Sequence, residues 1–92
     1  GGKKLSPIEV EDKIKEFDPE LEAVCIGIPD LQGILGEVVK AFVVKGNSIC
    51  DFEEIDDFLK NKLEKYKVPV EYEWINEVPK TASGKIQRQK LK

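Results

Sequence analysis

The sequence predicts a small α+β domain, in which a mixed sheet of about three strands is flanked by helices. Two apolar runs of strand length, 23–28 and 38–44, follow one another in the chain, and a third run, 70–78, alternates apolar and acidic residues. Two further stretches repeat apolar residues at helical spacing. The 92 residues are enough for one such domain with a modest core.

The first helix is predicted to begin at Ser6-Pro7 and to end at Asp18-Pro19. Ser6 can cap this helix, Pro7 suits its first position, and Glu9 has the spacing of a capping-box partner. Its core-facing residues are expected to be Val10, Ile14, Phe17 and Leu21.

The runs 23–28 and 38–44 are predicted strands, joined by a loop over 31–36 that contains two glycines. Because 23–28 is apolar throughout, we expect both its faces to be covered, as in a central strand. The second run is broken only by Lys40, and the composition of 46–48 predicts a turn after it.

A second helix is predicted to run from a capping box, with Asp51 as the cap and Glu54 as its partner, to Val68-Pro69. Apolar residues with steps of three and four follow the cap, which indicates one buried face. They are Phe52, Ile55, Phe58, Leu59, Leu63 and Tyr66.

The alternating run 70–78 predicts a half-buried strand with one acidic face, and Trp74 is expected in the core. Since a helix lies between the second and third strands, we expect these two strands to be parallel, with a right-handed crossover. Residues 87–92 are predicted to begin a final helix.

Composition excludes several classes of function. The net charge of −3 argues against general nucleic-acid binding. The sequence has no histidine, which removes Ser-His and Cys-His catalytic pairs, and its two cysteines are too few for a cysteine cluster. We therefore expect no metal site, and Cys25 is most simply a buried apolar residue. No apolar run is long enough to span a bilayer, and no signal peptide is visible.

The segment 79–88 is predicted to be an exposed loop followed by a basic segment. Gly84 permits a turn and close approach of a ligand, and Lys85 would lie at the loop tip. The cations gathered here favour a phosphate-bearing ligand, although a solvated lysine or a basic helix end has the same pattern. They are Lys80, Lys85, Arg88, Lys90 and Lys92.

The same segment closely resembles the last conserved motif of the adenylate-forming enzymes, which include acyl-CoA synthetases, peptide-synthetase adenylation domains and luciferases. It reads Pro79-Lys80-Thr81-Ala82-Ser83-Gly84-Lys85-Ile86-x-Arg88. Three other segments resemble this family in the same order: 2–11, which looks like the motif after the hinge between two domains, then 27–30 together with 36–44, and finally 66–69. Together they cover nearly the whole chain.

The resemblance implies an ATP-dependent reaction in two steps. A carboxylic acid attacks the α-phosphate of Mg²⁺-ATP to give an acyl-adenylate, and a thiol, usually that of coenzyme A, then displaces AMP. Lys85 matches the catalytic lysine of the first step, because an ammonium offsets the repulsion between carboxylate and phosphate.

Four other residues match positions that the resemblance connects with substrate or CoA. Gly2 matches the post-hinge glycine whose loop helps to form the thiol tunnel, although it would also suit a terminal linker. Lys3 would assist a phosphate-rich ligand, and Gly84 would let the loop enter the active site. Arg88 matches the motif's arginine, for which loop support and ligand contact both remain open.

Residues 1–92 accordingly resemble the mobile C-terminal domain of a cytoplasmic acyl-CoA synthetase, connected for instance with fatty acid metabolism. Its partner would be a large N-terminal domain of the same polypeptide, which would hold most of the ATP and acid sites, so that the isolated domain is expected to be inactive. Two alternatives remain: part of a peptide-synthetase adenylation domain, which uses a carrier-protein thiol, and a non-catalytic binding module of the same fold.

Overall fold

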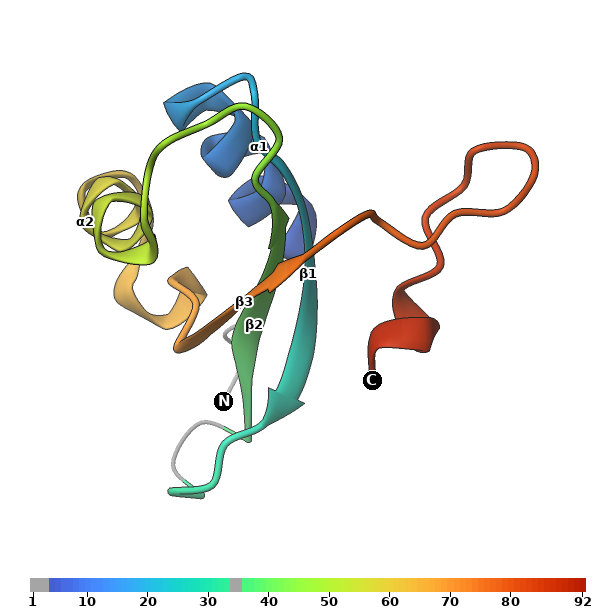
Figure 1. Cartoon of the computed structure of the whole chain (residues 1–92). Helices are drawn as coiled ribbons and strands as arrows, with labels where there is room; N and C mark the ends of the chain where they lie inside the picture. The colour runs from blue at the N-terminus through green and yellow to red at the C-terminus, as the bar shows by residue number, and fades with distance from the viewer. Residues whose placement is uncertain (1–3, 34–35) are drawn as a thin grey trace.

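The computed structural model describes residues 4–33 and 36–92 (Figure 1). The chain is arranged in the order α1 (Pro7–Phe17), β1 (Glu22–Pro29), β2 (Glu37–Val44), α2 (Phe52–Lys62), the 3₁₀ turn η1 (Lys65–Lys67), β3 (Glu71–Ile75) and the 3₁₀ turn η2 (Arg88–Leu91). The predicted α+β class is confirmed.

The three strands form one mixed sheet in the order β1-β2-β3. β1 and β2 are antiparallel, with Cys25 opposite Ala41, and β2 and β3 are parallel, with Ala41 opposite Tyr72. The predicted parallel pair is therefore confirmed. The central position predicted for the first strand is wrong, because β1 lies at an edge and β2 lies in the middle.

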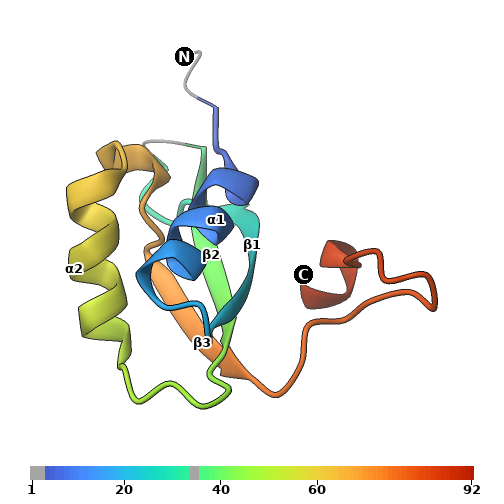
Figure 2. The ribbon, with the colours of Figure 1, turned by 90° about the horizontal axis from the view of Figure 1, so that it is seen from above.

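The two faces of the sheet are covered by different parts of the chain. Side chains of α1 and α2 pack with Cys25 and alternate residues of β2 in one core cluster. On the other face, Val24 and Phe42 pack with Val78, and Ile86 and Leu91 of the C-terminal segment lie against them. Figure 2 shows this segment running out past β1, on the side away from α2. Both faces of β1 are thus covered, as its apolar sequence predicted.

The two predicted capping boxes have different outcomes. At α2 the box is confirmed, since the Asp51 carboxylate accepts from the Glu54 N–H and Glu54 accepts from the Asp51 N–H. At α1 the helix begins after Ser6 as predicted, but Ser6 makes no side-chain cap bond. Glu9 is bound by the ammonium of Lys67, at 2.9 Å, so a residue distant in sequence holds this carboxylate.

The second helix is shorter than predicted. It ends at Lys62, because Leu63 takes an extended conformation (φ −124°, ψ 154°) and turns its side chain into the core. The 3₁₀ turn Lys65–Lys67 follows, and Val68 is also buried. The predicted final helix is likewise only the 3₁₀ turn Arg88–Leu91.

Trp74 does not lie in the core, contrary to the prediction. It is 37% exposed and stacks on Phe52 with 4.1 Å between ring centroids. β3 is an edge strand, so α2 covers the indole on one side only, while the ammonium of Lys45 lies 5.3 Å from the ring centroid.

Gly46 is constrained by both its backbone conformation and its surroundings. Its φ is +58°, and a Cβ added there would lie 2.8 Å from the backbone oxygen of Glu20. Gly33 has a similar φ of +71° but open space around the same position.

We expect Gly33→Ala to lower the free energy of unfolding by about 1–2 kcal/mol through backbone strain, and Gly46→Ala to lower it further through the added clash. Urea denaturation of the two variants measures the difference; equal losses would contradict it.

Candidate functional site

The predicted Lys85 loop is the turn of a short hairpin. Lys80 and Ile86 form an antiparallel bridge, and the Gln87 N–H donates to the Pro79 carbonyl at 2.9 Å. Inside it, the Thr81 N–H donates to the Lys85 carbonyl at 2.8 Å. The paired backbone gives the exposed loop a defined shape.

Gly84 closes the turn. Its N–H donates to the Thr81 carbonyl at 2.9 Å, and its φ of +90° lies in a region that residues with a Cβ rarely adopt. The Thr81 hydroxyl accepts from the Lys85 N–H at 3.0 Å and lies 3.0 Å from the Ser83 hydroxyl. The small polar residues before Lys85 therefore orient its backbone.

The hydrogen bonds of the hairpin engage only the backbone of Lys85 and leave its side chain free of them. The residue is exposed, and within residues 4–33 and 36–92 its ammonium makes no hydrogen bond or ion pair. By contrast, Lys80 on the same hairpin is bound to Glu22 at 2.8 Å. The hairpin thus presents one unpaired positive charge near its tip, a group suited to meeting an anion from outside the domain.

Arg88, the only arginine of the sequence, lies at the base of the hairpin. Its guanidinium donates to both Glu11 carboxylate oxygens, at 2.8 and 2.9 Å, and to the backbone oxygen of Cys25 at 3.3 Å. The Glu11 carboxylate also accepts the Cys25 N–H, at 2.7 Å. This arrangement provides the loop support that the sequence left open beside ligand contact; the ligand contact of Arg88 stays a prediction.

Sequence reasoning placed Glu11 within the motif-like segment 2–11 but gave it no role of its own. Its position directly after the buried Val10 was the available signal, since it places a carboxylate beside the apolar face of α1. The Glu11 side chain is only 11% exposed.

Cys25 itself is buried and free. Burial, and secondarily the negative charge of Glu11, raises the pKa of its thiol, so this group is not a nucleophile at neutral pH. The prediction that Cys25 is a buried apolar residue is confirmed.

The five predicted site residues are not all placed. Gly84, Lys85 and Arg88 lie on the one hairpin, whereas Gly2 and Lys3 lie outside the described residues and remain predictions. Among the described residues, no three His, Cys, Asp or Glu side chains gather to hold a metal ion. In that same part of the chain, no helix is long and apolar enough to cross a membrane.

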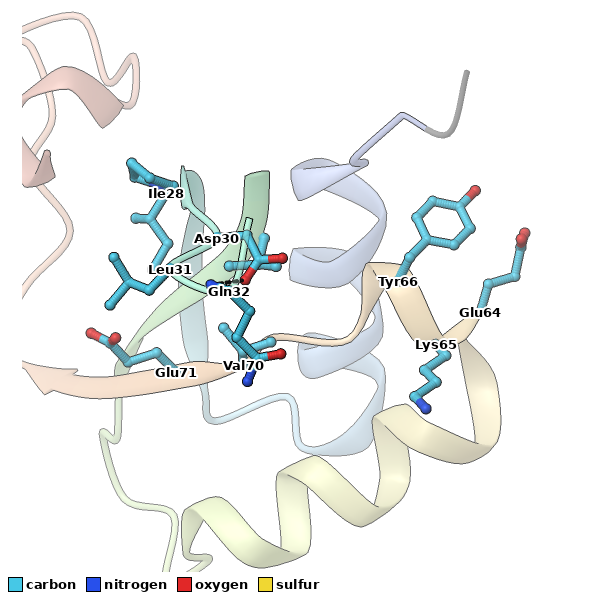
Figure 3. Close-up of a pocket in the computed structure, with 11 residues that line it drawn as sticks. Ile28, Asp30, Leu31, Gln32, Glu64, Lys65, Tyr66, Val70 and Glu71 are labelled. Atoms are coloured by element: carbon cyan, nitrogen blue, oxygen red, sulfur yellow. Dashed lines mark hydrogen bonds between the residues drawn. The ribbon is translucent and has the colours of Figure 1, made fainter. Parts of the chain in front are cut away.

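A separate groove of about 670 Å³ lies at the C-terminal end of β1, next to Ile28 and Pro29 (Figure 3). Its lining combines apolar and charged side chains from the loop after β1, from η1 and from the start of β3, but none from the hairpin. They include Ile28, Leu31, Lys65, Tyr66, Val70 and Glu71. Sequence reasoning did not predict this groove, because its walls come together only in the fold.

The fold and the hairpin define a class of domain: a three-stranded mixed sheet that presents a lysine near the tip of a supported loop. Residues 9–85 match the AMP-binding enzyme C-terminal domain. The chain belongs to this family.

Relatives with curated functions align with nearly the whole chain. It is 47% identical over 92 residues to the long-chain-fatty-acid–CoA ligase of Bacillus subtilis, and 44% identical over 91 residues to the oxalate–CoA ligase of Saccharomyces cerevisiae. These alignments include 99% and 96% of this chain but only 16% of each relative. The chain therefore spans about one sixth of the length of these ligases.

Solved structures agree with this relationship. The fatty acyl CoA synthetase of Mycobacterium tuberculosis matches with a TM-score of 0.85 at 29% identity, over 99% of this chain and 18% of that one. The structure of ATP-bound MatB from Rhodopseudomonas palustris matches with a TM-score of 0.86 at 29% identity, over the same shares. The predicted fold and family are confirmed.

The Thr81 hydroxyl offers a test of the hairpin. We expect Thr81→Val to speed hydrogen exchange of the Lys85 amide several-fold, because the acceptor of this N–H is lost. Thr81→Ser keeps a hydroxyl and serves as the matched control. Equal exchange rates at Lys85 in the two variants, measured by NMR, would show that the hydroxyl does not hold the turn.

Proposed function

We propose that the chain is the C-terminal domain of an AMP-forming acyl-CoA ligase and that it supplies Lys85 to the adenylation of a carboxylic acid. The observation that carries this proposal is the unpaired ammonium on a backbone-paired hairpin. Family membership and the CoA ligases among the relatives support it.

Lys85 has a clear physical task in this reaction. A carboxylate must approach the α-phosphate of ATP, and negative charge grows on the phosphoryl oxygens as the new bond forms and pyrophosphate leaves. A positive charge held between the two anions lowers the barrier, because its stabilisation is greatest where that charge develops. An ammonium that is already ion-paired would first have to give up its partner, and Lys85 has none among the described residues.

ATP, the acid and CoA are proposed to bind mainly to the larger remainder of the polypeptide, since this chain corresponds to about one sixth of its relatives. Mg²⁺ is placed there with ATP, where it would neutralise phosphate charge. On this view the 92-residue chain alone makes no adenylate. Gly2, Lys3, Gly84 and Arg88 are proposed to serve ATP or CoA in one of two orientations of the domain, with Gly2 at the thiol tunnel.

The names of the relatives favour CoA over a carrier-protein thiol as the acceptor. The Bacillus subtilis and Saccharomyces cerevisiae proteins are both CoA ligases, although their acids differ widely in size and polarity. Such a difference between relatives of this domain fits an acid pocket on the other domain, so the acid itself is left open.

The test separates the two half-reactions in the full-length parent enzyme. We expect Lys85→Ala to slow adenylation on the order of 10²–10³-fold, the loss seen when one preorganised donor is removed. Thioester formation from supplied acyl-adenylate and CoA should be nearly unchanged. Pyrophosphate release and acyl-CoA formation measure the two steps.

Lys15→Ala is the matched control, because Lys15 is an exposed lysine on α1, outside the hairpin. It should leave both steps intact. Equal loss of both half-reactions in Lys85→Ala would overturn the proposed role. If the parent forms no adenylate with any acid of a broad panel, the binding-module alternative would replace the ligase.

A further inference from the structure

Glu11 joins three separate parts of the domain through one carboxylate. It lies on α1, accepts the Cys25 N–H of β1 at 2.7 Å, and binds Arg88 of the C-terminal segment at 2.8 and 2.9 Å. Arg88 in turn donates to the Cys25 carbonyl at 3.3 Å. Both polar backbone groups of Cys25 are therefore satisfied by an ion pair whose members are 77 residues apart in the chain.

The hairpin that carries Lys85 is fixed to the body of the domain on both sides of its turn. On the incoming side, Lys80 binds Glu22 of β1 at 2.8 Å. On the outgoing side, Arg88 follows Lys85 by three residues and is held by Glu11. The Lys80–Glu22 pair is about half exposed and contributes little, whereas Glu11 is largely buried.

Loss of the Glu11 charge would leave the guanidinium of Arg88 without its counter-ion in a partly buried position. Removing one partner of such a pair is far more disruptive than removing an exposed pair. Arg88 would then turn towards water, and this side of the hairpin base would lose its polar contact with β1. The apolar contacts of Val78 and Ile86 would still hold the base, but the position of Lys85 relative to the sheet would be less tightly fixed.

We infer that Glu11 is a positioning residue for adenylation: through Arg88 it holds the base of the Lys85 hairpin at the edge of β1, so that rotation of the whole domain delivers Lys85 in one fixed place. This inference rests on the proposed function of Lys85 and adds to it a residue of α1 whose polar contacts are with Cys25 and Arg88, at the base of the hairpin and not at its tip. A displacement of about 1 Å at a reacting group costs up to roughly 100-fold in rate, so a loosened hairpin has a measurable effect.

The experiment uses Glu11→Gln in the full-length parent enzyme. Glutamine keeps an oxygen that can accept the Cys25 N–H but removes the charge that binds Arg88, so the fold is preserved better than with alanine. We expect kcat of adenylation to fall on the order of 10-fold or more, while the KM for ATP and the rate of thioester formation from supplied acyl-adenylate change little.

Glu9→Gln is the matched control. Glu9 lies on the same helix and also forms an ion pair, with Lys67 at 2.9 Å, but it contacts no part of the C-terminal segment. This variant should leave adenylation unchanged. A loss in Glu9→Gln as large as that in Glu11→Gln, or an equal loss of both half-reactions in Glu11→Gln, would overturn the inference, because either would indicate a general loss of stability.

A double-mutant cycle with Lys85→Ala tests whether Glu11 acts through Lys85. If it does, Glu11→Gln costs nothing further once the lysine is absent; additive losses would overturn the inference. Hydrogen exchange at the Arg88 Nε–H, which donates to the Cys25 carbonyl, gives a readout independent of the chemistry, with faster exchange expected in Glu11→Gln than in Glu9→Gln. Normal adenylation by Lys85→Ala would defeat the proposed function, whereas unchanged exchange in Glu11→Gln would defeat the positioning contact alone.

Discussion

The free edge of β1 is the constraint on which the rest of the structure depends. A strand at a sheet edge leaves backbone donors and acceptors unpaired, and β1 is also buried on both faces, so water cannot easily serve them at Cys25. Glu11 and Arg88 come from opposite ends of the sequence and bond to the N–H and the carbonyl of Cys25, respectively. The edge of the sheet thereby holds the first helix and the C-terminal segment together.

The covering of the second face gives the hairpin its base. Val78, just before the hairpin, is buried against Val24 and Phe42, and Ile86, just after its turn, packs on the same cluster. Figure 1 shows the hairpin extending well away from the sheet. The loop is therefore anchored by apolar contacts at its base and by ion pairs at its sides, and only its tip, with Lys85, is free of both.

Features determined by near neighbours were predictable from sequence. The capping box of Asp51 and Glu54 and the turn around Gly84 involve residues within a few positions of each other. Features determined by distant residues were not: the ion pair between Glu9 and Lys67 joins residues 58 positions apart. The edge position of β1 was missed for the same reason, because the residues that bury its second face come from the end of the chain.

The two cations of the hairpin motif show where a sequence pattern stops being informative. Lys85 and Arg88 are three residues apart, and the charge pattern alone suits both to an anion, while the family resemblance leaves loop support open for Arg88. The fold separates them by placing a carboxylate beside one and none beside the other. Arginine suits the held position, because its planar fork reaches both Glu11 oxygens and the Cys25 carbonyl at once. Lysine suits the free one, because under the proposed function a single mobile charge would follow a phosphoryl group, and the support given by Arg88 would confine that mobility to the side chain of Lys85.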